Sequence, residues 1–158
     1  MLLFARQYAK NQADAEDIVQ DAFTRFWKQR HRFNKNAASC LFGCVRWAAL
    51  DWLRKNRRRA RREESSASYE FIIREADYFD RSLENEELVE ATQQAIQEMP
   101  DLQREVVVLK IWGELTFNEI GEALEISQNT AASRYRYGLA TLKTKLKGMK
   151  EWNLTTKN

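Results

Sequence analysis

The chain contains few of the residues that interrupt regular structure, with one proline and five glycines among 158 residues. A β-sandwich or barrel needs many tight turns, so this scarcity argues against both and favours helices. The apolar share of 44% is enough for a packed core, which argues against a disordered chain. We therefore predict an all-α fold.

Cysteine and histidine are also scarce, and this limits the disulfide and metal chemistry open to the chain. The two cysteines, Cys40 and Cys44, cannot build a disulfide scaffold, and we interpret them as reduced thiols of a cytoplasmic protein. Together with His31, the single histidine, they leave a zinc ligand set incomplete, so we predict no metal site. A glycine-rich phosphate loop is also missing. We expect neither an enzyme nor a cofactor, and no small-molecule substrate.

Long apolar runs are absent as well. No stretch approaches the length of a membrane span. Residues 1–6 have neither the charged lead nor the long apolar stretch of a secretory signal. We expect no membrane insertion.

Charge is abundant but unevenly distributed. Residues 1–62 carry 15 Lys and Arg against 5 Asp and Glu, residues 63–101 carry 2 against 12, and residues 102–158 carry 9 against 6. This distribution predicts two basic modules joined by an acidic connector. A basic surface indicates a polyanionic partner, above all nucleic acid. The dense cationic run at 54–62 argues against the alternative of a merely solvated surface.

Apolar periodicity predicts helices in both modules. In the first, we expect helices over residues 2–9, from near Asp14 to 27, and over 37–58, with Asp14 capping the second. The apolar periodicity is absent over residues 63–87, and we interpret this segment as the linker. We predict two small helical domains at 1–62 and 88–150, the first a bundle of three or four helices, with a tail at 151–158.

The second module has the signature of a helix-turn-helix. Thr116 and Glu119 form a capping-box pattern before a short helix ending at Leu124, and Ser127 is placed to cap a final helix over 128–146. We expect Leu139 on the inner face of that final helix. Its first turns carry polar residues that suit a DNA groove: Asn129 for adenine, Arg136 for guanine and Arg134 for a phosphate. A plain helical hairpin is the alternative.

Aromatic and cationic residues alternate in the first module. Trp47 and Phe33 lie near Arg32, Arg46 and Arg54 in the sequence. Exposed aromatic rings beside cationic side chains bind single-stranded nucleic acid, because each base that stacks on a ring contributes about 1–3 kcal/mol of binding free energy. The alternative, that these aromatics are core residues, stays open for Trp47 and Phe33.

Four motifs occur in order: DAEDIVQDAF at 14–23, ALDWLR at 49–54, MPDLQREVVVL at 99–109, and the helix-turn-helix at 116–139. Together they resemble the bacterial RNA polymerase sigma factors of the extracytoplasmic-function (ECF) group. Such proteins have two helical domains, called sigma-2 and sigma-4. The resemblance implies a transcription initiation factor that binds core RNA polymerase and promoter DNA, and that an anti-sigma factor often restrains.

The resemblance also implies a role for each set of residues. The set expected to dock on core polymerase is Asp17, Gln20, Asp21, Phe23 and Trp27. The set expected to melt and read the −10 element is Arg32, Phe33, Asn34, Lys35, Arg46, Trp47 and Arg54. The set expected to read the duplex −35 element is Asn129, Ser133, Arg134, Arg136 and Tyr137.

Two further readings stay open at this point. One is a stand-alone regulator that uses the helix-turn-helix without polymerase, and the other is a helical adaptor for proteins alone. The acidic connector could lie in a basic polymerase channel, cover the basic face of the first domain, or serve as a solvated spacer.

Overall fold

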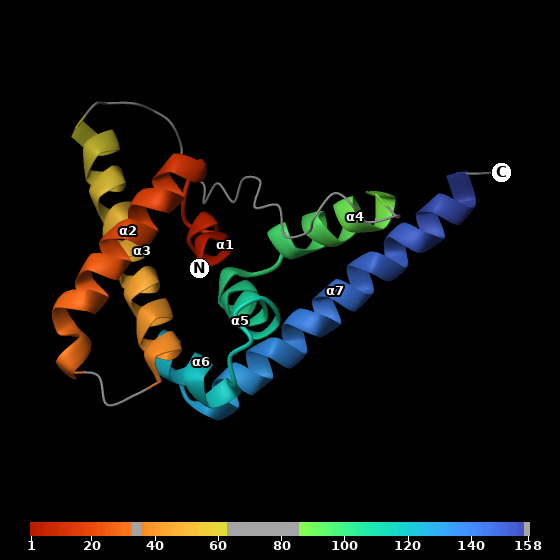
Figure 1. The fold of residues 1–158 in the computed structure, drawn as a ribbon. Helices are drawn as coiled ribbons and strands as arrows, with labels where there is room; N and C mark the ends of the chain where they lie inside the picture. Colours follow the sequence, from red (N-terminus) through yellow and green to blue (C-terminus); the bar gives the residue numbers. More distant parts are fainter. Residues whose placement is uncertain (33–35, 63–85, 157–158) are drawn as a thin grey trace.

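The computed structural model describes residues 1–32, 36–62 and 86–156, and within these ranges the chain forms helices and no strand (Figure 1). The predicted all-α class is confirmed. The first half contains α1 (Leu2–Arg6), α2 (Gln12–Gln29), the short 3-10 helix η1 (Arg30–Arg32) and α3 (Ala37–Arg62). The second half contains α4 (Glu86–Gln97), α5 (Asp101–Ile111), α6 (Phe117–Leu124) and α7 (Gln128–Thr156).

The N-terminal domain is built on α2 and α3, which lie side by side, with α1 packed against both. Ile18 of α2 and Val45 of α3 are buried between them. The Phe4 ring of α1 meets Phe42 and Tyr8 edge to face, at centroid distances of 5.9 and 5.7 Å. Aromatic pairs favour this geometry, so α1 is fixed to the bundle although it is short.

The C-terminal domain packs α4, α5 and α6 along the long helix α7. Buried valines at 106–108 give α5 an apolar surface on most of its circumference. Arg104 is also buried, and its guanidinium donates to the carbonyls of Gln97 (2.7 Å) and Met99 (3.0 Å) and pairs with Asp101. This arginine therefore satisfies the C-terminal end of α4 and joins it to α5.

The two domains are in contact. α3 packs on α6, and α1 touches α5 (Figure 1). One continuous cluster of buried apolar residues runs through both domains, from Phe4 to Leu142.

Several predicted helix boundaries need correction. Asp14 does not cap α2: Asn11 does, because its extended backbone lets Oδ1 accept from the amide of Asp14 at 2.8 Å. α1 ends at Arg6 rather than at residue 9, α3 continues to Arg62, and α7 continues to Thr156. Leu139 is 39% exposed, so its placement on the inner face of α7 was wrong.

The acidic connector lies outside the described residues, apart from its last two positions, which begin α4.

Candidate nucleic-acid interface

All five residues predicted to dock on polymerase are exposed on α2. Phe23 and Trp27, one helical turn apart, are 45% and 65% exposed. The Arg30 guanidinium lies 4.0 Å from the Trp27 ring centroid and donates to the Trp27 carbonyl at 2.6 Å. This cation–π contact holds the indole ring in place at the end of α2. Rigid exposed aromatics of this kind are typical anchors for a protein partner.

A chain of ion pairs crosses from α2 to α3 beside these aromatics. Arg25 pairs with Asp21 on its own helix and with Asp51 on α3, both at 2.8 Å, and Asp51 also pairs with Arg54 at 2.8 Å. Arg25 lowers the pKa of the Asp51 carboxyl through its hydrogen bond. The arrangement orients both carboxylates toward one groove between the helices.

That groove encloses about 190 Å³ and combines an apolar floor with a charged rim. Its lining residues are Asp17, Ile18, Asp21, Ala48, Asp51, Trp52 and Lys55. The sequence indicated the α2 carboxylates of this groove, but Asp51 was not among the predicted site residues. Its i, i+3 spacing from Arg54 was the available signal.

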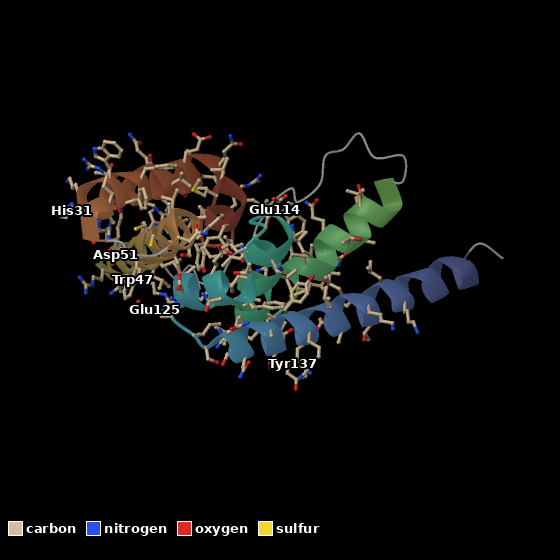
Figure 2. The ribbon with its side chains drawn as sticks, turned by 60° about the horizontal axis from the view of Figure 1, so that its bottom comes forward. His31, Trp47, Asp51, Glu114, Glu125 and Tyr137 are labelled. Atoms are coloured by element: carbon tan, nitrogen blue, oxygen red, sulfur yellow. The ribbon has the colours of Figure 1, made fainter. Side chains whose placement is uncertain are left out.

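The structure divides the residues predicted for the −10 element. Trp47 is 44% exposed on α3, which favours the site interpretation over a place in the core (Figure 2). Arg46 instead turns toward the other domain, where its Nε lies 3.4 Å from Glu105 Oε1. Arg54 is exposed and held by Asp51. Arg32 ends η1, whereas Phe33, Asn34 and Lys35 lie outside the described residues.

The predicted helix-turn-helix is formed by α6, a short turn and the beginning of α7. The Thr116 hydroxyl and Glu119 carboxylate cap each other's backbone amides, as predicted, and this capping lowers the pKa of Glu119. Ser127 Oγ accepts from the amide of Thr130 at 3.0 Å, so the predicted cap of the last helix is also confirmed. Ala131 is fully buried and anchors the start of α7.

The turn between α6 and α7 depends on Gly121 and Glu125. Glu125 adopts the left-handed conformation, with φ of 57°, and its amide donates to the Gly121 carbonyl. A Cβ on Gly121 would lie 2.7 Å from the carbonyl oxygen of Ile126, so only glycine allows this approach. The turn therefore fixes the angle at which α7 leaves α6.

Polar residues line the outer side of α7, as the helix-turn-helix prediction requires. Asn129 and Arg136 are exposed, and Ser133 and Arg134 are half-buried. Tyr137 is 57% exposed and points away from α4, with the Arg136 guanidinium 5.4 Å from its ring centroid (Figure 2). These side chains form one continuous polar strip from the first turn of α7.

Four hydrogen-bonded contacts join the two domains, and sequence reasoning missed them. Glu105 accepts from the Tyr8 hydroxyl as well as facing Arg46. Glu122 Oε2 accepts from Ser39 Oγ at 3.0 Å. Asn36 donates its side-chain amide to Glu119. Partners 59 to 97 residues apart leave no local pattern in a single sequence.

Burial raises the pKa of the Tyr8 hydroxyl well above its ordinary value, and the nearby Glu105 charge and hydrogen bond add to this. Tyr8 is therefore a proton donor to Glu105 over the whole neutral range.

The cysteines lie half-buried on α3 as free thiols, and burial raises the pKa of Cys44. In the part of the chain that the structure describes, no three His, Cys, Asp or Glu side chains gather into a metal site. None of the described helices has the length and apolar composition of a membrane span.

Two helical domains, one with a helix-turn-helix and one with exposed aromatics beside cations, define a modular DNA-binding protein. Comparison with known proteins gives the family. The family model for Sigma-70 region 2 matches residues 2–59, and the model for Sigma-70 region 4 matches residues 90–142. Together they match more than two thirds of the chain. The chain belongs to the sigma-70 family of RNA polymerase sigma factors, in its ECF group.

Two curated relatives and one solved structure are similar to the chain. The ECF RNA polymerase sigma factor SigW of Bacillus subtilis is 29% identical over 147 residues, which are 88% of this chain and 79% of SigW. RpoE of Cereibacter sphaeroides is 28% identical over 134 residues, 83% of this chain and 71% of that protein. The sigma factor RpoE of Bartonella quintana, solved in complex with the anti-sigma factor NepR, superposes with a TM-score of 0.66 at 22% identity. That match covers 92% of this chain and 89% of the solved one.

The protein is a transcription initiation factor whose partners are core RNA polymerase and promoter DNA. A stand-alone helix-turn-helix regulator is not favoured, because the region 2 match covers residues 2–59, nearly all of the N-terminal domain.

Proposed function

We propose that the two domains divide the work of initiation among three surfaces. The exposed side of α2 docks on core polymerase through Asp17, Gln20, Asp21, Phe23 and Trp27. The −10 element is engaged by residues 32–35 before α3 and by Arg46, Trp47 and Arg54 of α3. The outer strip of α7 reads the −35 duplex.

The observation that carries this proposal is the separation of the three surfaces onto three helices. The α2 residues are exposed without facing α7, so a polymerase contact there leaves the helix-turn-helix available. Trp47 supplies an aromatic face for an unpaired base, and flipping a base costs a few kcal/mol that such a face repays.

Each α7 contact has a distinct expected role. Arg136 offers a bidentate fork to guanine, and Asn129 offers an amide to adenine. Arg134 and Ser133, set back on the helix, suit phosphates that fix the register. Tyr137 extends the contact surface by one helical turn.

We further propose that the protein acts in the cytoplasm by binding, with no catalytic step of its own. The solved relative is in complex with an anti-sigma factor, and this supports an anti-sigma factor as a regulatory partner here. The half-buried thiols Cys40 and Cys44 suit a reduced cytoplasm.

The test is run-off transcription with purified core polymerase and a pool of randomised promoters. Enrichment of templates with two separated elements is expected. Arg136→Ala should weaken −35-dependent initiation more than polymerase binding, with Lys147→Ala on the same helix as control. Asp17→Ala combined with Phe23→Ala should do the reverse, with Lys28→Ala on α2 as control. If the two variants fail in the same way, the division of work is wrong.

A further inference from the structure

Cys40 and Cys44 are the two cysteines of the chain, and neither has a role in the three surfaces proposed above. Both lie half-buried on α3 as free thiols. They are four residues apart on one helix, so their side chains lie on the same face, one turn from each other. Two thiols are therefore presented together at a place that solvent still reaches.

The contacts of neighbouring residues fix the direction of this face. Gly43, one residue before Cys44, faces α6, since a Cβ there would lie 3.5 Å from the carbonyl oxygen of Ala123. Asp51, two turns after Cys44 on the same face, pairs with Arg25 of α2 at 2.8 Å. The face that carries the cysteines therefore lies on the side of α3 nearer α2.

The electrostatics of Cys44 show that the two thiols are close neighbours. Burial raises the pKa of Cys44, the negative charge of a Cys40 thiolate raises it further, and the positive charge of Arg25 opposes both effects. Two thiolates at this place therefore repel each other unless a cation lies between the sulfurs.

The spacing of the two cysteines does not allow a disulfide within α3, but it fits a bridging ion. The Cβ atoms of such a pair are about 5–6 Å apart, whereas a disulfide needs about 3.5–4.5 Å. A two-coordinate ion holds its two sulfurs on opposite sides, about 4.6 Å apart at a metal–sulfur distance of about 2.3 Å. The sulfurs reach this separation by rotation about χ1, so α3 keeps its helical backbone.

The number of available ligands selects the kind of ion. Thiolates favour soft metals, namely Cu(I), zinc and the iron of iron–sulfur clusters. Structural zinc and iron–sulfur clusters take four protein ligands, and among the described residues no third His, Cys, Asp or Glu joins the two thiols. A zinc ligand set is thus incomplete here, but two sulfurs suffice for a two-coordinate ion such as Cu(I).

We propose that Cys40 and Cys44 form a binding site for one soft, two-coordinate cation of the Cu(I) class on the first turns of α3. On binding, each thiol releases its proton to solvent and each sulfur donates an electron pair to the ion, with no change of oxidation state. The two thiolates and the monovalent ion together carry one negative charge, and Arg25 lies on the side that receives it. The bound ion ties together the first turns of the helix that carries Trp47.

The test is an anaerobic competition for Cu(I) between the full chain and the coloured chelator bicinchoninate. Wild type should take up one Cu(I) per chain, with no change of size in gel filtration. Cys40→Ser and Cys44→Ser should each weaken Cu(I) binding by about 100-fold or more, because the second sulfur acts at a high effective concentration. An ion shared between two chains would overturn the site.

The matched control keeps two thiols but separates them. Cys40→Ser combined with Ala37→Cys places the thiols seven residues apart, about 10.5 Å along the helix, which is too far for one ion to bridge. Ala37 is exposed, so no packing is lost. This variant should bind Cu(I) as weakly as the single serine variants, and affinity equal to that of wild type would overturn the site.

A second measurement uses the unaltered chain. One equivalent of Cu(I) should slow alkylation of both cysteines by iodoacetamide, followed by mass spectrometry, by about tenfold or more, because a metal-bound sulfur is a poor nucleophile. The same amount of Zn(II) should slow it less than about twofold, since zinc finds only two of its four ligands. Protection of one cysteine alone, or equal protection by Zn(II), would contradict a two-coordinate site. Neither measurement involves polymerase or DNA, so failure of this site and failure of the proposed function are distinguishable.

Discussion

The two main helices of the N-terminal domain differ in what covers them. On α2, carboxylates and two aromatic rings are exposed, and their contacts lie within the N-terminal domain. On α3, the residues nearest the predicted −10 loop are engaged by the C-terminal domain. The α2 side chains are therefore accessible along the helix, whereas on α3 Arg46 is held by Glu105 while Trp47 and Arg54 stay exposed. The comparison thus separates a helix with a fully open outer face from one that is only partly open.

The largest expected effect is on α2, the helix whose outer face is exposed. Phe23→Ala with Trp27→Ala should weaken core polymerase binding at least about 30-fold, since exposed aromatic anchors contribute about 2 kcal/mol or more at such interfaces. Because both rings are exposed, the melting temperature should hardly change. Fluorescence anisotropy with labelled polymerase and a thermal melt measure the two quantities. A loss of stability equal to the loss of binding would show that α2 is a structural face.

The next prediction concerns α3, the helix that the C-terminal domain contacts. Gly43→Gln should drive α3 and α6 apart, because a Cβ at residue 43 would already be in van der Waals contact with the Ala123 backbone and the rest of the glutamine side chain continues beyond it, and small-angle X-ray scattering should show a larger radius of gyration. Gly43→Ala is the matched control, since its Cβ makes only ordinary contact there and helix propensity rises in both variants. An unchanged radius for Gly43→Gln would show that the α3–α6 contact accommodates the longer side chain.

Sequence reasoning was reliable where local chemistry decides the structure. The capping box at Thr116 and the Ser127 cap are encoded within four residues, and both are confirmed. Asn11 was missed as the cap of α2 because Asp14 offered a competing carboxylate three residues later. Leu139 was misplaced because an apolar residue was assumed to lie inside.

The contacts that cover α3 could not be predicted from the sequence. Tyr8 and Glu105 are 97 positions apart, and Glu105 looks like a solvated residue beside an apolar run. The acidic connector was one predicted cover for the basic face, but its residues lie outside the described ranges. In the structure, carboxylates of the C-terminal domain face Asn36, Ser39 and Arg46. Tertiary packing, and not local propensity, determines which carboxylate pairs with Arg46.

A smaller effect is expected at Tyr8. Tyr8→Phe removes the hydroxyl donor to buried Glu105, whose Oε1 then keeps only the longer contact with Arg46, and should lower the free energy of unfolding by about 1–3 kcal/mol, as expected for a hydrogen bond to a buried charged group. Tyr137→Phe is the control, because that ring is exposed. Urea denaturation of both variants measures the difference. Equal stability of Tyr8→Phe and wild type would mean that the Tyr8–Glu105 contact contributes nothing to the stability of the fold.

The smallest effect is the pH dependence of that same contact. Burial and Glu105 raise the pKa of Tyr8 above its ordinary value in the folded protein, whereas in the unfolded chain the pKa takes its ordinary value of about 10. The folded state therefore holds the proton more tightly, and the stabilisation is fully present below about pH 10. As the pH rises above 10, the unfolded chain loses this proton first, so the advantage of wild type over Tyr8→Phe should shrink. The unfolding free energies of wild type and Tyr8→Phe are measured from pH 8 to 11 and subtracted. Both proteins contain the same lysines, so the contribution of lysine titration cancels in the difference. A difference that stays constant over this range would mean that the hydroxyl of Tyr8 is solvated in the folded protein and does not donate to Glu105.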